Sequence, residues 1–488
     1  MAATSTPAPA PPSLVDTTFG PAWREDDLPE GRGVLLACLA IGVFAGLTLP
    51  FTEPGLAAFL VLVASGGVVL SLTRERDWFT WSAAAACLGL ALMVVLRDAV
   101  WIVTLGLLAS AVLVAASLTR ARSLPGMVLG ALAWPLSGLR GLPWLGRTFR
   151  AFGGSSGSLA AVRTVVVSLV ALLVFGGLFA SGDAIVGSWL GSVLPDVRGS
   201  VLLRLFVVLA VGGTVLAASY LALNPPSVDP APRRRPAQHR FEWLAPVLLV
   251  DAVFVLFLAA QAAAVFGGHD YVRRATGLTY ADYVHQGFAQ LTLATLLMLL
   301  VVWAAARKAG PSPADRWWLR GSLGALCLLT LVVVASALHR MELYQQAYGF
   351  TRLRLLVDAF EGWLGLVVLG VVVAGLSLKG GWLPRVALLS GAAVLLALAV
   401  ANPDAWIARH NIERYHATGK VDWGYLRGLS ADATPTLASL PVAQAACALP
   451  GPHARSEDPW TGWNLARARA KDDLARVHVL GAGTPPCT

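Results

Sequence analysis

Two stretches of this chain hold most of the residues able to do chemistry, and both adjoin long apolar segments. Residues 267–291 read GGHDYVRRATGLTYADYVHQGFAQL and include His285. Residues 339–363 read HRMELYQQAYGFTRLRLLVDAFEGW, where four-residue spacing places Arg340, Tyr344 and Tyr348 on one helix face. Arginines beside carboxylates in the second stretch predict a buried ion-pair network, because a lone charge is costly in lipid.

One acidic residue lies inside an apolar segment. Asp251 sits in WLAPVLLVDAVFVLFLAAQ, and a central Asp costs about 2.5–3.5 kcal/mol on insertion into a membrane. It should therefore face the protein interior, either as a proton or cation site or as a group that hydrogen-bonds a neighbouring helix. The candidate functional cluster comprises Asp251, His285, Arg340, Glu342, Tyr344, Tyr348, Arg352 and Glu361.

The sequence offers little that indicates an enzyme. It lacks metal-ligand spacings such as HExxH or paired CxxC, and it lacks a phosphate-binding loop. We therefore expect no metal and no cofactor. Asp404, Asp422 and Asp432 in the tail are interpreted as solvated helix caps, with general acid–base catalysis as the alternative.

Eleven apolar stretches, each of about 20 residues, are long enough to cross a bilayer as helices. They cover residues 33–50, 54–72, 79–96, 99–117, 160–181, 201–221, 243–265, 284–305, 318–338, 356–377 and 383–401. The chain is 56% hydrophobic and 13% charged, against about 25% charged in soluble proteins. The predicted fold class is all-α: a polytopic transmembrane helix bundle of about 11 spans, with a small helical extracytoplasmic C-terminal cap.

The net charge of +9 is explained by membrane topology. Twenty Lys and Arg residues flank one set of alternate loops and eight flank the other set. Because cytoplasmic loops carry the excess of positive charge, the N-terminus should be cytoplasmic and the tail extracytoplasmic, as expected of a multi-pass protein of the cell membrane. The charge therefore gives no support to nucleic-acid binding.

The predicted spans divide the chain into five parts. We expect a disordered cytoplasmic leader (1–32), a first membrane block (33–221), a Pro/Arg-rich cytoplasmic linker (222–242), a second membrane block (243–401) and an extracytoplasmic helical tail (402–488). Within the first block, residues 119–158 are too interrupted by proline to span. They should lie along the inner interface, with Arg140, Arg147 and Arg150 facing headgroups.

Turn and capping residues predict helix ends near the candidate cluster. Gly349 should end a helix over 340–348, and Thr351 should cap the next helix. In the tail, helices are expected over 402–418, ended by Gly419, and over 423–429, 433–448 and 463–476.

Two of the five cysteines, Cys447 and Cys487, lie in the tail. An extracytoplasmic tail meets an oxidising environment, which permits a disulfide between them.

The ordered segments TYADYVHQGFAQL, HRMELYQQAYGFTRLR, NPDAWIARHNIERY, GKVDWGYLRGLSADATPTL and WNLARARA make this chain similar to a known family. Over roughly residues 240–470 it resembles a bacterial multi-spanning membrane protein family catalogued only as a domain of unknown function. The resemblance implies a membrane protein and implies no activity.

Three classes of function stay open. The first is a non-enzymatic protein that recognises, senses or assembles with something at the outer face, such as an envelope protein or a lipid-linked ligand. The second is a secondary transporter that uses Asp251 and the Arg/Glu network. The third is a lipid-linked transferase with its site at the outer interface. We favour the first class.

Overall fold

The chain folds as an all-α protein, which confirms the predicted fold class. The computed structural model describes residues 20, 23, 28–151, 164, 168, 171, 175, 179, 199–229, 237–276, 288–378, 380–449 and 458–480. Helices make up the regular structure of these residues, and none of them is in a strand.

Eight helices of the described chain are long and apolar enough to cross a membrane. Their residues are Trp78–Leu96 in α4, Val100–Leu118 in α5, Ser200–Leu223 in α10, Phe241–Ala263 in α11, Gln290–Lys308 in α13, Pro313–Tyr348 in α14, Arg352–Ser377 in α15 and Leu383–Val400 in α16. Two shorter apolar helices, α2 (Arg32–Thr48) and α3 (Leu56–Leu72), precede them. Ten of the eleven predicted spans thus contain an apolar helix, which supports a membrane-embedded bundle.

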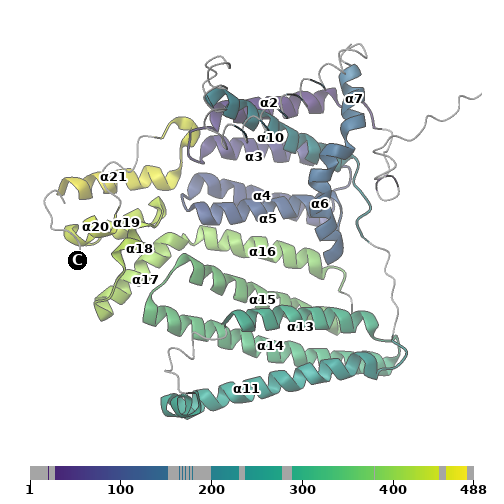
Figure 1. Cartoon of the computed structure of the whole chain (residues 1–488), viewed down its shortest axis with the longest axis vertical. Helices are drawn as coiled ribbons and strands as arrows, with labels where there is room; N and C mark the ends of the chain where they lie inside the picture. Colours follow the sequence, from purple (N-terminus) through teal and green to yellow (C-terminus); the bar gives the residue numbers. More distant parts are fainter. Residues whose placement is uncertain are drawn as a thin grey trace, which may run out of the picture. The chain divides into compact units, whose positions relative to one another are not determined.

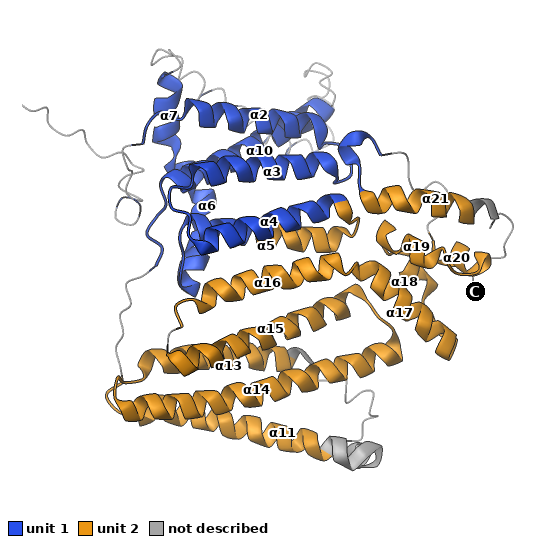
Figure 2. Cartoon of the chain, turned by 180° about the vertical axis from the view of Figure 1, so that it is seen from behind, with its two compact units in different colours: residues 1–95, 111–230, 458–464 blue, residues 96–110, 231–457, 465–488 orange. Residues whose placement is uncertain are grey.

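The chain forms two compact units, coloured separately in Figure 2. Unit 1 contains residues 1–95, 111–230 and 458–464, and unit 2 contains residues 96–110, 231–457 and 465–488. The division at residue 230 falls inside the predicted linker.

In unit 1, α2 packs closely against α10 (Gly199–Leu223) through glycines. A Cβ atom at Gly42 would lie 2.6 Å from the carbonyl oxygen of Val208, so the helices are closer than any side chain would permit. The unit also contains α6 (Leu124–Arg140) and α7 (Leu142–Arg150).

The helical bundle of unit 2 is formed by α11 (Phe241–Thr276), α13 (Phe288–Lys308), α14, α15 and α16 (Figure 1). Two contacts fix α11 beside α14 in parallel. Near one end, Arg240 Nε lies 2.6 Å from Asp315 Oδ1, and further along, Ser336 Oγ donates to Gln261 Oε1 at 2.5 Å.

Short helices beyond one end of this bundle form a cap (Figure 1). They are α17 (Pro403–Thr418), α18 (Trp423–Arg427), η1 (Ala431–Ala433), α19 (Thr434–Leu437), α20 (Val442–Ala448) and α21 (Leu465–Leu480). The core of the cap is apolar and includes Ile407, Leu426 and Leu437, each at most 2% exposed.

The capping residues behave as the sequence predicts. Gly349 ends α14 with φ of 86°, and the Thr351 side chain accepts a hydrogen bond from the backbone N–H of Arg354 at the start of α15. Gly419 ends α17 with φ of 71°. The expected helix over 340–348 is instead the last part of α14, since no residue interrupts the helix before Tyr348.

Other expectations are corrected or lie outside the described residues. Arg140 is fully buried and donates from Nε to the carbonyl oxygen of Trp23 at 3.2 Å, so the prediction that it faces headgroups is wrong. The expected tail helix over 433–448 is split into α19 and α20 around Pro441. The predicted span over 160–181 and the leader over 1–32 lie mostly outside the described residues.

Candidate functional site

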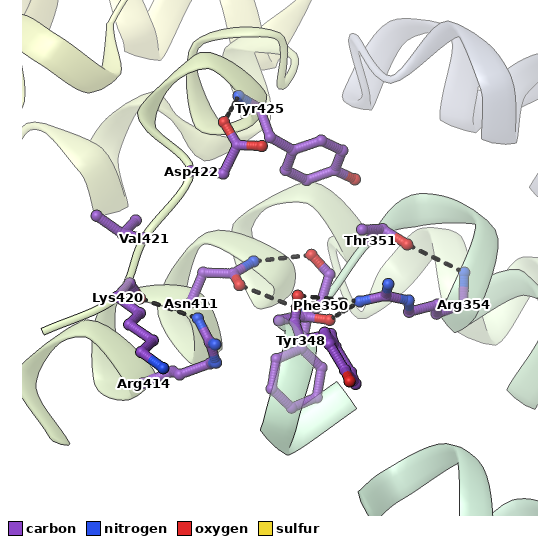
Figure 3. A pocket seen from close by; sticks show the side chains of 11 residues that line it. Tyr348, Phe350, Thr351, Arg354, Asn411, Arg414, Lys420, Val421, Asp422 and Tyr425 are labelled. Atoms are coloured by element: carbon purple, nitrogen blue, oxygen red, sulfur yellow. Dashed lines mark hydrogen bonds between the residues drawn. The ribbon is translucent and has the colours of Figure 1, made fainter. Parts of the chain in front are cut away.

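A pocket of about 350 Å³ lies where the turn between α14 and α15 meets the cap. Its size is within the range of small-molecule sites. Figure 3 shows the side chains that line it, all of which belong to unit 2. The lining residues are Tyr348, Gly349, Phe350, Thr351, Arg354, Asn411, Arg414, Lys420, Val421, Asp422 and Tyr425.

Arg354 is held in place on one side of the pocket while part of its guanidinium stays available. Its Nη1 donates to the carbonyl oxygens of Tyr348, at 3.2 Å, and Gly349. Its Cζ lies 4.4 Å from the centre of the Tyr344 ring, a cation–π contact. Nε and Nη2 make no hydrogen bond to the described chain. Because a guanidinium carries five N–H donors in a planar fork, this edge can bind an anionic oxygen.

Arg414 and Lys420 supply positive charge on the other side of the Tyr348–Phe350 segment (Figure 3). Arg414 donates to the carbonyl oxygens of Gln346 at 3.0 Å, Ala347 at 2.6 Å and Lys420 at 2.9 Å, so it joins the end of α14 to the cap. Lys420 is exposed, and its ammonium group has no partner in the described chain. Arg414 is thus a scaffold, whereas Lys420 is available to a ligand.

The remaining wall is fixed by hydrogen bonds to the backbone. The Asn411 side chain donates to the carbonyl oxygen of Phe350 at 2.8 Å and accepts from its N–H at 3.0 Å. Tyr425 Oη accepts from the backbone N–H of Arg352 at 2.7 Å. Burial raises the pKa of Tyr425, so the phenol keeps its proton as a hydrogen-bond donor. Asp422 accepts from the N–H of Tyr425 at 2.9 Å, as the predicted helix cap.

Three cationic side chains therefore face one carboxylate, that of Asp422, in a pocket with fixed walls. Guanidinium and ammonium groups with unused donors are the groups that proteins use to bind phosphate or carboxylate oxygens. The arrangement can hold an anion. The described lining residues present no pair of carboxylates that would serve as general acid and base.

A buried ion pair connects the end of the bundle to the cap beside this pocket. Arg352 at the start of α15 binds Asp404 of α17 in a bidentate fork, with Nε 3.0 Å from Oδ1 and Nη2 bound to Oδ2. Asp404 is 0% exposed. It also accepts from the indole N–H of Trp101 at 3.1 Å and the backbone N–H of Ser430 at 2.9 Å, so both of its oxygens are satisfied.

A second buried carboxylate holds the segment before α5 against the cap. Asp432 accepts from the backbone N–H groups of Asp98 at 2.7 Å and Ala99 at 3.0 Å, and it lies 3.4 Å from Arg97 Nη1. Asp98 in turn binds Nη1 of Arg467 in α21 at 2.8 Å. Three arginines and three aspartates thus balance one another, which is typical of a structural network.

The two acidic groups differ in how their charge is supported. Burial alone would raise the pKa of Asp404, but the hydrogen bonds and charge of Arg352, with hydrogen bonds from Ser430, outweigh it and hold the pKa below its ordinary value. For Asp432, burial prevails over the hydrogen bonds of the Asp98–Ala99 backbone and the charge of Arg97, so its pKa is raised. The ionised form is therefore more securely stabilised at Asp404 than at Asp432.

The described members of the candidate cluster do not converge on one point. Tyr348 lines the pocket, Tyr344 stacks beside it at 4.8 Å between ring centres, and Arg352 lies in the ion pair. Glu361 is buried and accepts from Thr292 Oγ1, while Glu342 is exposed. Arg340 is partly buried on α14.

Asp251 lies well apart from these residues, and His285 lies outside the described residues. Asp251 of α11 lies near Cys327 of α14. Cys327 precedes Tyr344 by 17 positions along α14, which is about 25 Å of helix.

The predicted network of Arg340 and Arg352 with Glu342, Asp358 and Glu361 is not formed as expected. Arg352 binds Asp404 instead, and the hydrogen bonds to Asp358 and Glu361 come from the neutral side chains of Gln345 and Thr292.

Asp404 and Asp432 are buried ion-pair partners, so their interpretation as solvated caps is wrong. A signal was present in the sequence: both aspartates lie in motifs that carry the family resemblance.

In the cap, Cys447 takes part in a disulfide bond, whereas Cys38, Cys87 and Cys327 do not. Cys487 lies outside the described residues. Its pairing with Cys447 stays a prediction.

No group of three or more potential metal ligands occurs within the described part of the chain.

Fold and site together define an all-α protein with a membrane-type helical bundle and a cap that closes over a cationic pocket. Residues 83–440, more than half of the chain, match the family described as Domain of unknown function (DUF4153). The chain belongs to this family. The match begins well before residue 240, where the resemblance was expected to start, and ends before WNLARARA. No curated protein and no solved structure matches the chain.

Proposed function

We propose that this protein is a non-enzymatic recognition protein of the cell membrane that binds the phosphate of a lipid or lipid-linked ligand in the pocket between the α14–α15 turn and the cap. The observation that carries the proposal is that the pocket holds two sets of cationic donors with no partner in the described chain: Nε and Nη2 of Arg354, and the ammonium group of Lys420 across the Tyr348–Phe350 segment. Charged donors fixed in this way bind phosphate oxygens well, and the Tyr425 hydroxyl adds a neutral donor.

The position of the pocket favours a membrane lipid as the source of the phosphate. Exposed apolar side chains begin on α15 at Leu353, which is 71% exposed and directly precedes Arg354. They continue along α15 at Phe360, Leu366, Leu369, Val373 and Leu376. Such a surface fits hydrocarbon, so the pocket lies at the level of the headgroups.

Binding to the pocket is expected to depend on Lys420. For purified protein in detergent, Lys420→Gln should weaken binding of short-chain phosphatidylglycerol by about tenfold, the loss of one charge-assisted hydrogen bond of about 1.5 kcal/mol. Short-chain phosphatidylcholine should bind less well to both the wild type and the variant. Binding of inorganic phosphate is measured in the same way, to show whether the pocket recognises the phosphate group without the rest of the lipid. Titration calorimetry provides the measurement.

Arg409→Gln is the matched control. Arg409 lies on α17, is exposed and does not line the pocket. This substitution therefore removes one positive charge, as Lys420→Gln does, but outside the pocket. Equal affinities of Lys420→Gln, Arg409→Gln and wild type for phosphatidylglycerol would rule out the pocket as the binding site.

Membrane orientation is the second expectation. We infer a cytoplasmic N-terminus and an extracytoplasmic cap from the excess of Lys and Arg on one set of loops. Alkaline phosphatase fused after Arg427 should be active, and a fluorescent protein fused at the same position should be dark. Bright fluorescence with an inactive phosphatase would place the cap and its pocket in the cytoplasm.

A second candidate function is secondary transport. It is favoured by Asp251 in α11, whose Oδ1 is buried and has no hydrogen-bond partner in the described part of the chain. A carboxyl of this kind within a membrane helix is typical of ion or proton pathways. Uptake of a solute into vesicles that is lost in Asp251→Asn, with lipid binding unchanged, would favour transport over recognition.

A further inference from the structure

Two carboxyl groups lie one helical turn apart inside the bundle of unit 2. Glu361 of α15 is 1% exposed and accepts a hydrogen bond from Thr292 Oγ1 of α13. Asp358 accepts from Nε2 of Gln345 of α14, and Gln345 is itself 2% exposed. Both groups are therefore held between helices that we treat as spanning the membrane.

Neither carboxyl has a cationic partner within the described chain. Arg352, six positions before Asp358, is bound to Asp404, and the Nη1 of Arg354 is bound to carbonyl oxygens of the turn. The second oxygen of Asp358, Oδ1, is buried and has no hydrogen-bond partner among the described residues. Arg352 thus serves another group, and Arg354, although its Nε and Nη2 make no hydrogen bond to the described chain, forms no ion pair with Asp358.

Of the other charged groups on the packed helices, Arg340 of α14 lies five positions before Gln345 and makes no ion pair with either carboxyl. His339 lies beside Glu342. Glu342 of α14 adds a further negative charge that acts on Asp358. The charged residues of α13, Arg307 and Lys308, lie at the far end of that helix. Arg385 of α16 is equally remote, near the opposite end of the bundle from Asp358.

An ionised carboxylate without a cation is strongly disfavoured in a membrane interior, and two adjacent ones also repel each other. A carboxyl group that takes up a proton loses its charge and gains an O–H donor, which removes both costs. We propose that Asp358 and Glu361 form a proton-binding site in the membrane bundle, with both carboxyls protonated at neutral pH.

The polar side chains of the bundle indicate from which side the protons come. Gln345, Asp358 and Glu361 lie near the end that carries the pocket. Towards the other end the core is mostly apolar and includes Trp243, Val247, Met298, Val302, Leu326 and Val368, each at most 8% exposed, with Asp251 and Ser322 as polar groups among them. The pocket end is the nearer one to both carboxyls, so we expect protons to exchange there. The helices α14 and α15 contribute residues to both sites, so proton uptake can act on the pocket.

Infrared spectroscopy of the full-length protein in lipid tests the proposal. The wild type should show, at neutral pH, the C=O stretching band of protonated carboxyl groups, and this band should shift in D₂O. Asp358→Asn and Glu361→Gln should each remove about one carboxyl's share of the intensity. Glu413→Gln is the control, since Glu413 is exposed on α17 outside the bundle and its loss should leave the band unchanged.

Absence of the band from the wild type, or a band that neither substitution reduces, would overturn the proposal.

Labelling with dicyclohexylcarbodiimide keeps the test independent of the variants, because this apolar reagent couples to protonated carboxyls. Peptide mass spectrometry should find the adduct on Glu361 or Asp358 of the wild type, forming more slowly as the pH rises. Labelling confined to exposed carboxyls such as Glu342 would again count against it. Lipid binding by the pocket can fail without affecting either result.

Discussion

Replacing Arg352 by Gln is expected to destabilise the attachment of the cap by about 3–5 kcal/mol, the usual cost of removing one partner from a buried ion pair. The reason is the position of Asp404, which is 0% exposed and would be left with its charge uncompensated. Hydrogen exchange measured by mass spectrometry on peptides of α17 should accelerate by about 10²–10⁴-fold at neutral pH, the change in opening equilibrium that this loss corresponds to.

Two further variants show whether the effect belongs to the ion pair. Arg352→Lys keeps the charge but loses the bidentate fork, so it should fall between wild type and Arg352→Gln. Arg409→Gln removes an exposed charge from the same helix α17 and should change exchange little. Equal exchange in wild type and Arg352→Gln would show that the pair does not hold the cap.

The destabilisation should depend on pH in a defined direction. Because hydrogen bonds and the charge of Arg352 overcome the effect of burial, the folded-state pKa of Asp404 lies below its ordinary value. A carboxyl with a lowered pKa contributes its full stability above its ordinary pKa of about 3.9, and loses it as the pH falls through the folded-state pKa. The difference between wild type and Arg352→Gln should therefore be largest near neutral pH. It should shrink as the pH falls, first through the pKa of Asp404 in the variant, which burial raises once Arg352 is gone, and then through the lowered pKa in the wild type.

Replacing Cys447 by Ser is expected to destabilise the cap by roughly 3–4 kcal/mol if Cys447 is bridged to Cys487, because the bond would close a loop of about forty residues. Cys447 is disulfide-bonded and lies in the apolar core region of the cap, 9% exposed. Exchange in α20 and α21 should rise in the variant, and dithiothreitol should produce the same rise in the wild type but none in the variant. Non-reducing peptide mapping that recovers two alkylated thiols at positions 447 and 487 would contradict the prediction.

The sequence predicts most of the helical architecture because its signals are local. Long apolar runs mark the spans, and Gly349, Thr351 and Gly419 mark helix ends by their backbone preferences alone. The helix over 340–348 was predicted, but its continuity with the span over 318–338 was not, because polar residues after Leu338 suggested the end of the span.

The partners of the charged residues could not be predicted in the same way. Arg352 has Asp358 and Glu361 within ten positions, yet it binds Asp404, 52 positions away. Likewise, Asp432 binds the segment of Asp98, more than 300 positions earlier. Local spacing identifies which charges must be compensated in a membrane protein, but only the tertiary fold determines which of them meet.

The pocket was only partly visible in the sequence. Tyr348 belonged to the candidate cluster, whereas Arg354, Arg414 and Lys420 did not. Lys420 and Asp422 occur in the segment GKVDW, whose composition is that of an ordinary surface loop. The turn after α17 brings this loop to the end of α14, where Lys420 and Asp422 line the pocket.

The most direct test of phosphate recognition is a cryo-electron microscopy map of the protein in nanodiscs that contain phosphatidylglycerol. The proposal predicts headgroup density in the pocket, with phosphate oxygens within hydrogen-bond distance of Arg354 Nε or Nη2 and of Lys420 Nζ, and loss of that density in Lys420→Gln. A well-ordered pocket that contains only water, or that is filled by the protein's own chain, would contradict it.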